Sequence, residues 1–151
     1  MKTLSNASCL TEILDRLKTV QQDSPRQWGM MTPHQMICHL DDSFQAAMGR
    51  RQVSPAERQY GPLMKWLALN MPMKWPKGVP TRPEIDQQKS GTPPAEFDTD
   101  VQELLALTAE FARQPRSFTF AVHPIFGQMT EREWMRWGYL HADHHLRQFG
   151  C

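Results

Sequence analysis

Two histidines near the C-terminus have the spacing of a metal-binding pair. His141 and His145 lie four residues apart in a segment with helical periodicity, so both imidazoles would point to the same side of a helix. Charged residues occupy the opposite side, which we expect to face water: Arg132, Arg136, Asp143 and Arg147. Neutral imidazoles are common ligands of transition-metal ions. The pair therefore predicts part of a metal site that faces the protein interior.

A third ligand is expected from a different helix, because two protein ligands are too few for a stable site. His39 is the best candidate, since it lies at the edge of an apolar helical stripe (Met36, Ile37, Leu40 and Phe44). Three histidines would leave at least one position open on the ion, which is typical of catalytic or ligand-binding metals. Spacing alone leaves open the alternative that these imidazoles are only hydrogen-bonded core residues.

Four other residues are candidates for the surroundings of the ion. His144 points well away from the ligand direction, so we expect it beside the ion or at the rim of a pocket. Asp42 follows His39 by almost one turn and would either support that ring, accept a proton, or be an ordinary surface carboxylate. Trp134 shares the ligand face and would wall a cavity or simply fill the core. His123, which precedes a proline, would reach the cavity or serve as a turn residue.

Start and stop signals predict the helices that must position these side chains. The clearest starts are two capping boxes, Thr32 with Gln35 and Thr130 with Glu133. Asp98 or Thr99 is expected to begin another helix, with Gln102 as the capping partner, that ends before Pro115. The other predicted helices cover residues 7–22, 33–48, 62–70 (a short one) and 131–149. The fold class is therefore all-α, an antiparallel bundle of about four helices.

Residues 71–96 contain six prolines and two glycines, a density that sustains neither helix nor central strand. We expect this long connection to cover one end of the bundle and to shape a pocket, because loops of this length in small domains are usually functional. Residues 117–122 alternate like a strand but have no evident partner, so we expect an extended segment.

Composition limits the class of protein. The chain has 151 residues, which fits one domain over 1–151, and a net charge of +1. This balance argues against nucleic acid as a partner. We expect no membrane span, because no apolar stretch is long enough. Three cysteines without a CxxC pair argue against a disulfide framework and favour the cytoplasm.

Several segments resemble the DinB-like superfamily. Residues 28–40 are similar to its second-helix signature, and residues 141–149 are similar to its closing HxxHHxxQ pattern. The His-Pro-x-Phe-Gly element at 123–127 and the Thr-x-x-Glu-Trp element at 130–134 further resemble one short branch of it. Together these segments span nearly the whole chain in order.

This resemblance implies an antiparallel four-helix bundle with a three-histidine site for zinc or nickel, formed by His39, His141 and His145. It also implies a homodimer. Members of the superfamily include S-transferases and isomerases that use low-molecular-weight thiols, and metal-dependent hydrolases. A metal-dependent enzyme that activates a thiol or a water to attack a small-molecule substrate is therefore the first expectation. The connection at 71–96 departs from better-known members, so their individual activities do not transfer.

A non-catalytic module that binds a metal, a ligand or a second subunit is the alternative. The two readings differ in access to the ion, because a structural metal is closed by four protein ligands whereas a catalytic one keeps an open position. His144 or Asp42 as a fourth ligand would favour the non-catalytic module.

Overall fold

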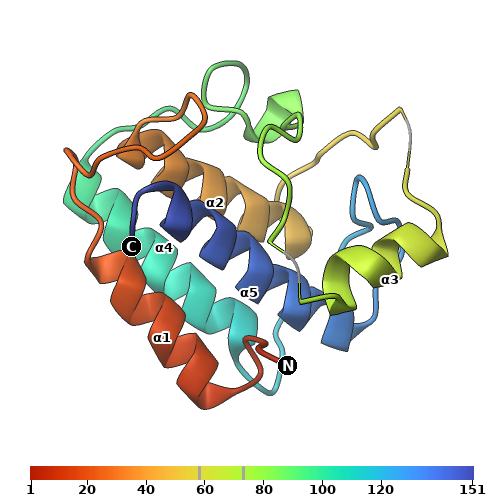
Figure 1. Cartoon of the computed structure of the whole chain (residues 1–151). Helices are drawn as coiled ribbons and strands as arrows, with labels where there is room; N and C mark the ends of the chain where they lie inside the picture. The colour runs from red at the N-terminus through yellow and green to blue at the C-terminus, as the bar shows by residue number, and fades with distance from the viewer. Residues whose placement is uncertain (58, 73) are drawn as a thin grey trace.

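The protein is all-helical in its regular secondary structure. The computed structural model describes residues 1–57, 59–72 and 74–151, and within these ranges it contains five α-helices and no strand. The helices are α1 (Ala7–Lys18), α2 (Pro33–Ala47), α3 (Pro62–Asn70), α4 (Phe97–Ala112) and α5 (Glu131–Gln148), with one 3₁₀ turn, η1 (Pro83–Ile85) (Figure 1). Within the same ranges, none of these helices is long and apolar enough to cross a bilayer.

The two predicted capping boxes are confirmed. The Thr32 hydroxyl accepts a hydrogen bond from the Gln35 amide at 3.1 Å, and the Gln35 side chain accepts one from the Thr32 amide at 2.9 Å. Thr130 and Glu133 form the same reciprocal pair at the start of α5. Each box satisfies two amides that would otherwise lack a partner in the first helical turn, so both helices that carry the candidate ligands begin at well-defined residues.

Two predicted helix boundaries are wrong. The first helix ends at Lys18 rather than near residue 22, and Thr19 caps it by donating to the carbonyl of Arg16 at 2.7 Å. The helix expected after Asp98 or Thr99 begins earlier, at Phe97, because the Glu96 carboxylate accepts from the amide of Thr99 at 2.8 Å. Glutamate is not among the preferred N-cap residues, so the sequence carried no clear signal for this start.

Helices α2 and α4 run in the same direction, which differs from a fully antiparallel order (Figure 1). His34 near the start of α2 bonds to Asp100 near the start of α4 at 2.6 Å, and Arg50 just beyond α2 bonds to Glu110 near the end of α4 at 3.0 Å. The long connection between these helices, which includes α3 and residues 71–96, lets the chain return to the end where α2 began.

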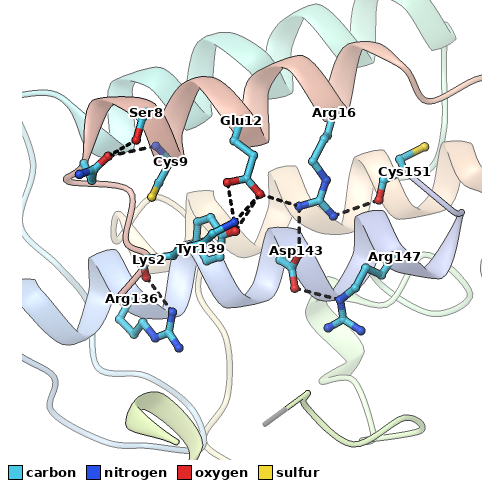
Figure 2. Close-up of polar contacts among 11 residues, drawn as sticks. Lys2, Ser8, Cys9, Glu12, Arg16, Arg136, Tyr139, Asp143, Arg147 and Cys151 are labelled. Carbon is cyan, nitrogen blue, oxygen red and sulfur yellow. Dashed lines mark hydrogen bonds and ion pairs between the residues drawn. The ribbon is translucent and has the colours of Figure 1, made fainter. Parts of the chain in front are cut away.

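Helices α1 and α5 likewise run parallel to each other and opposite to α2 and α4. Glu12 bonds to Tyr139 and Arg16 bonds to Asp143, both at 2.9 Å, and Figure 2 shows this row of polar contacts along the two helices. Antiparallel contacts therefore join α2 to α5 and α1 to α4, whereas parallel contacts join α2 to α4 and α1 to α5.

The core of these four helices is closely packed around Gly138 on α5. A methyl group at this position would lie 2.8 Å from Leu4 Cδ1, closer than real contacts allow, and 3.0 Å from Phe111 Cε1, which is tighter than most real contacts. The absence of a side chain lets α5 approach its neighbours at this point. Phe44, Phe111 and Trp134 are each at most 1% exposed around it, as expected of an interior packed to crystal-like density.

The prediction that the charged side of α5 faces water is wrong for Arg136. Its side chain is only 8% exposed, and it donates to the carbonyls of Leu69 at the end of α3 and Lys2 in the N-terminal segment, at 2.8 and 2.7 Å. Figure 2 shows the bond to Lys2. The guanidinium therefore joins three separate parts of the chain, which the periodicity of one helix does not reveal.

Replacing Arg136 with methionine tests this role. Arg136→Met keeps much of the apolar stem but removes the donors for two backbone carbonyls, so we expect the free energy of unfolding to fall by about 2 kcal/mol. Chemical denaturation followed by circular dichroism measures the change. Arg132→Met, at an exposed position one turn earlier on α5, is the matched control and should stay within about 0.5 kcal/mol of wild type. Equal effects in the two variants would contradict the assignment.

Candidate metal centre

His39, His141 and His145 meet where α2 and α5 lie against each other. Each offers a ring nitrogen, and these atoms all lie within 4.8 Å of one another. Nε2 of His39 lies 3.2 Å from Nε2 of His141. His39 and His145 are buried, at 3% and 8% exposure. The three candidates chosen from spacing and from the resemblance are thus brought together, with two ligands from one helix and one from another.

Hydrogen bonds determine which nitrogen of two of these rings carries the proton. Nδ1 of His39 lies 2.7 Å from the carbonyl of Ile85, and Nδ1 of His145 lies 2.9 Å from Oε1 of Gln148. The Gln148 amide is oriented by its own bond to the carbonyl of Trp28 at 2.9 Å. Since both partners of the imidazoles are acceptors, each Nδ1 carries the hydrogen and each Nε2 keeps a free lone pair.

The surroundings keep all three rings uncharged near neutral pH. Burial lowers the pKa of His39, and it lowers the pKa values of His141 and His145 well below the usual value. The neighbouring imidazoles lower these last two pKa values further, because adjacent positive charges repel one another. A neutral imidazole is the form that binds a metal ion, so the cluster needs no deprotonation before it acts as a ligand set.

Asp42 does not join the cluster. The side chain is 1% exposed, and it accepts from the amide and hydroxyl of Thr92 at 2.8 and 2.7 Å and from Gln87 at 2.8 Å. Arg51 completes its partners with an ion pair at 2.8 Å. These contacts hold residues 71–96 against α2, so Asp42 is neither a surface carboxylate nor a hydrogen-bond partner of His39.

His123, His144 and Trp134 border one cavity of about 450 Å³ together with the three clustered histidines. His144 packs edge-on against His145, with ring centres 5.1 Å apart, and its Nδ1 is buried without a partner in the described part of the chain. Trp134 is fully buried and stacks on Phe120. The rest of the wall is mainly apolar and includes Tyr60, Val79, Ile125, Phe126 and Trp137.

The proline-rich connection supplies residues that the sequence analysis did not single out. Ile85 provides the carbonyl for His39, and Trp75 lies over His141 with ring centres 6.2 Å apart. The Trp75 indole is held by a bond to the carbonyl of Ala68 at 2.8 Å. Trp75 could have been noticed in the sequence as a single tryptophan among prolines. The Ile85 carbonyl could not, because a backbone group leaves no mark in the sequence. The expected cover over the pocket is therefore present.

A second group with metal-binding residue types joins α2 to α4. Oδ2 of Asp100 accepts from His34 at 2.6 Å, from the amide of Ala95 at 3.1 Å and from the thiol of Cys38 at 3.6 Å. Burial, and then the charge of Asp100, raise the pKa of Cys38 to about 12, so the group remains a thiol. The hydrogen bonds to Asp100 thus explain why these three residues lie together, because they join α2 to α4.

Comparison with known proteins places the chain in a family. Among curated proteins and among solved structures, nothing matches it. One family model, described as a protein of unknown function (DUF1569), matches residues 4–150. Because the match includes all five helices and every residue of the candidate centre, the chain belongs to the DUF1569 family.

Proposed function

We propose that this protein is a metal-dependent enzyme of the DinB-like superfamily in which His39, His141 and His145 hold one divalent transition-metal ion, zinc or nickel. The observation that carries the proposal is the convergence of three neutral imidazoles, two of which have their outer nitrogen held by an acceptor. In this proposal α1, α2, α4 and α5 correspond to the four-helix bundle of that superfamily.

The hydrogen bonding of the cluster supports an ion as its missing partner. If His141 carries its proton on Nε2, it can donate to His39, but its Nδ1 is then a buried acceptor without a partner in the described part of the chain. If the proton is on Nδ1, two lone pairs face each other at 3.2 Å and a buried donor is unpaired. Either tautomer of His141 leaves one buried polar group unsatisfied, which costs about 1–3 kcal/mol. In the tautomer with the proton on Nδ1, a cation bound between the rings would remove the repulsion between the two lone pairs.

The number and position of the candidate ligands favour an ion that is accessible from the cavity over an ion that is closed in by four protein ligands. Within the described residues, neither Asp42 nor His144 belongs to the three-histidine group, and the cluster borders the cavity. When bound, a divalent ion at such a site lowers the pKa of a water or a thiol and so produces a nucleophile near neutral pH. The chain supplies neutral ligands and an apolar wall that excludes bulk water from a small-molecule substrate.

Two further features belong to this proposal. A low-molecular-weight thiol would be a co-substrate if the reaction is S-transfer, and water would be the attacking group if it is hydrolysis. A homodimer is also proposed. Leu63 and Trp66 on α3, which are 70% and 54% exposed, offer apolar surface for contact with a second copy.

Metal content is the direct test of the site. Untagged protein purified without a nickel column should contain about one zinc or nickel per chain by elemental analysis. His39→Ala and His141→Ala should each remove it, because two imidazoles are too few to retain the ion during purification.

His34→Ala is the matched control for metal content. His34 lies on α2 like His39 but belongs to the cluster around Asp100, so this variant should keep the metal of the wild type. Wild-type protein that lacks metal and cannot be reloaded with zinc or nickel at pH 7–8 would contradict the proposed centre. Loss of metal in His34→Ala alone would instead move the site to that second cluster.

Turnover separates the enzyme from a non-catalytic module. Metal-loaded protein should conjugate glutathione or cysteine to an electrophilic aromatic compound, or hydrolyse an aryl ester, at a rate that falls at least about 100-fold in His141→Ala and is unchanged in His34→Ala. A loaded protein that binds these compounds but converts none of them would favour the non-catalytic module.

Gln148 should increase the affinity of the three-histidine site for the ion without binding the ion itself. Gln148→Leu removes the acceptor that holds Nδ1–H of His145, so we expect zinc to bind about tenfold more weakly in a competition titration with a chelator. Gln102→Leu, at an exposed position on α4, should leave the affinity unchanged. Thermal unfolding checks that both variants are folded. Unchanged affinity in Gln148→Leu would show that this hydrogen bond does not orient the ligand.

A further inference from the structure

Residues 123–127 form a tight loop that is bonded to itself. The amide of His123 donates to the carbonyl of Gly127 at 3.0 Å, and the amide of Gly127 donates back at 2.9 Å. Gly127 has φ +67°, a backbone conformation in which a side chain would be strained. The loop is also attached to the preceding connection, because the carbonyls of Pro124 and Ile125 accept from the amides of Ala56 and Tyr60, both at 2.9 Å.

The loop determines the tautomer of its own histidine. Nδ1 of His123 accepts from the amides of Ile125 and Phe126, each at 3.1 Å. A ring nitrogen that accepts hydrogen bonds cannot carry a hydrogen of its own, so the proton of the neutral ring is on Nε2. Burial lowers the pKa of His123 to about 3, and the ring therefore stays neutral at every physiological pH. It can donate a hydrogen bond through Nε2, but it is too weak a base to collect a proton.

The remaining nitrogen of this ring is available to a molecule in the cavity. His123 lines the cavity, packs on Phe126 with ring centres 4.7 Å apart, and lies 5.6 Å from Trp137, which in turn lies 4.9 Å from His141. No residue in the described part of the chain hydrogen-bonds to Nε2, and the edge that carries Nδ1 is turned to the loop backbone. A donor held in an apolar wall without a partner is a recognition element for an acceptor on a ligand.

The charges around the cavity indicate that this acceptor is uncharged. Two arginines line it, but Arg51 is paired with Asp42, and Arg82 donates to the carbonyl and hydroxyl of Ser54 at 3.1 and 2.8 Å. Both guanidiniums are already engaged in these contacts, and the rings packed against His123 are those of Phe126, Trp134 and Trp137, an apolar setting in which an unpaired charge is costly. A carbonyl oxygen needs only the single N–H donor that His123 provides.

We propose that Nε2–H of His123 donates a hydrogen bond to an uncharged carbonyl oxygen of the substrate, which makes the substrate class small, mainly apolar, carbonyl-bearing molecules. This inference rests on the proposed function for its account of the reaction, because it places the carbonyl at His123 and the rest of the molecule along Trp137 toward the three histidines. The donor would fix the position of that oxygen and so orient the rest of the molecule along the cavity wall.

Matched probes test the donor by binding alone. 2-Acetylnaphthalene and 2-ethylnaphthalene have the same ring system, but only the first has a carbonyl oxygen, and quenching of the tryptophans in the cavity wall reports their binding. His123→Phe keeps the aromatic packing and removes the N–H. We expect the ratio of the two dissociation constants to change by about tenfold between wild type and His123→Phe, in the direction of weaker ketone binding. An unchanged ratio would overturn the proposal.

Side-chain nitrogen spectra of the wild-type protein provide a test that needs no variant. The resonances of His123 should show the Nε2–H tautomer and should not titrate between pH 8 and pH 5. Addition of 2-acetylnaphthalene should shift the Nε2–H signal, whereas 2-ethylnaphthalene should leave it near its starting position. A ring that carries its proton on Nδ1, or that titrates near its ordinary pKa of about 6.5, would contradict the inference.

Elemental analysis keeps this result separate from the metal proposal. His123→Phe should retain the full metal content of the wild type, because His123 is not a ligand in the three-histidine group. If the ratio of dissociation constants is unchanged in His123→Phe while the protein still binds its metal, only the proposed hydrogen bond from His123 to a carbonyl is refuted. If the protein binds no metal but the ratio of dissociation constants still changes in His123→Phe, His123 remains a ligand-recognition residue.

Discussion

The structure depends on keeping three neutral imidazoles together in the interior between α2 and α5. Burial disfavours charge on each ring, but a neutral imidazole still has one donor and one acceptor that need partners. His39 and His145 obtain acceptors for their Nδ1–H groups from Ile85 and Gln148. Their Nε2 atoms are thereby left as acceptors in the group that they form with His141, and in the proposed centre a cation would bind these lone pairs.

The long connection between α2 and α4 is part of this arrangement and not only a link. It contributes the carbonyl for His39, places Trp75 over His141, and is attached to α2 through Asp42. It also allows α4 to run parallel to α2, because the chain has enough length to return to the other end of the molecule. A short turn would have forced the opposite direction and would have left the histidines without a cover.

The cavity has its polar groups at separate places along an apolar wall. His123 and His141 both pack against Trp137, with ring centres 5.6 and 4.9 Å from it. Hydrogen bonds hold the rings of His39, His145 and His123 in place. Such fixed groups lose little freedom when a ligand binds, which is the usual reason that binding sites are built on rigid supports. The three histidines border this cavity, and in the proposed metal centre that access distinguishes the site from a closed structural one.

The sequence by itself determined most of the helices and the three histidines of the candidate centre. Capping boxes at Thr32 and Thr130 marked the starts of α2 and α5, and the i, i+4 spacing of His141 and His145 placed both on one face, because these are local properties of a helix. The all-helical class, the short α3 and the irregular 71–96 connection were predictable for the same reason. The resemblance to a known pattern added weight to His39 as the third ligand.

Only the tertiary structure decided how these elements meet. The direction of α4, the burial of Arg136 between Leu69 and Lys2, the use of Asp42 as an anchor for the connection, and the Ile85 carbonyl behind His39 all join residues far apart in the chain. The role of Nε2 of His123 is of the same kind, since its tautomer follows from a loop closed by backbone hydrogen bonds. Periodicity specifies which face of a helix is apolar, but it carries no information on which distant backbone group or side chain will lie against that face.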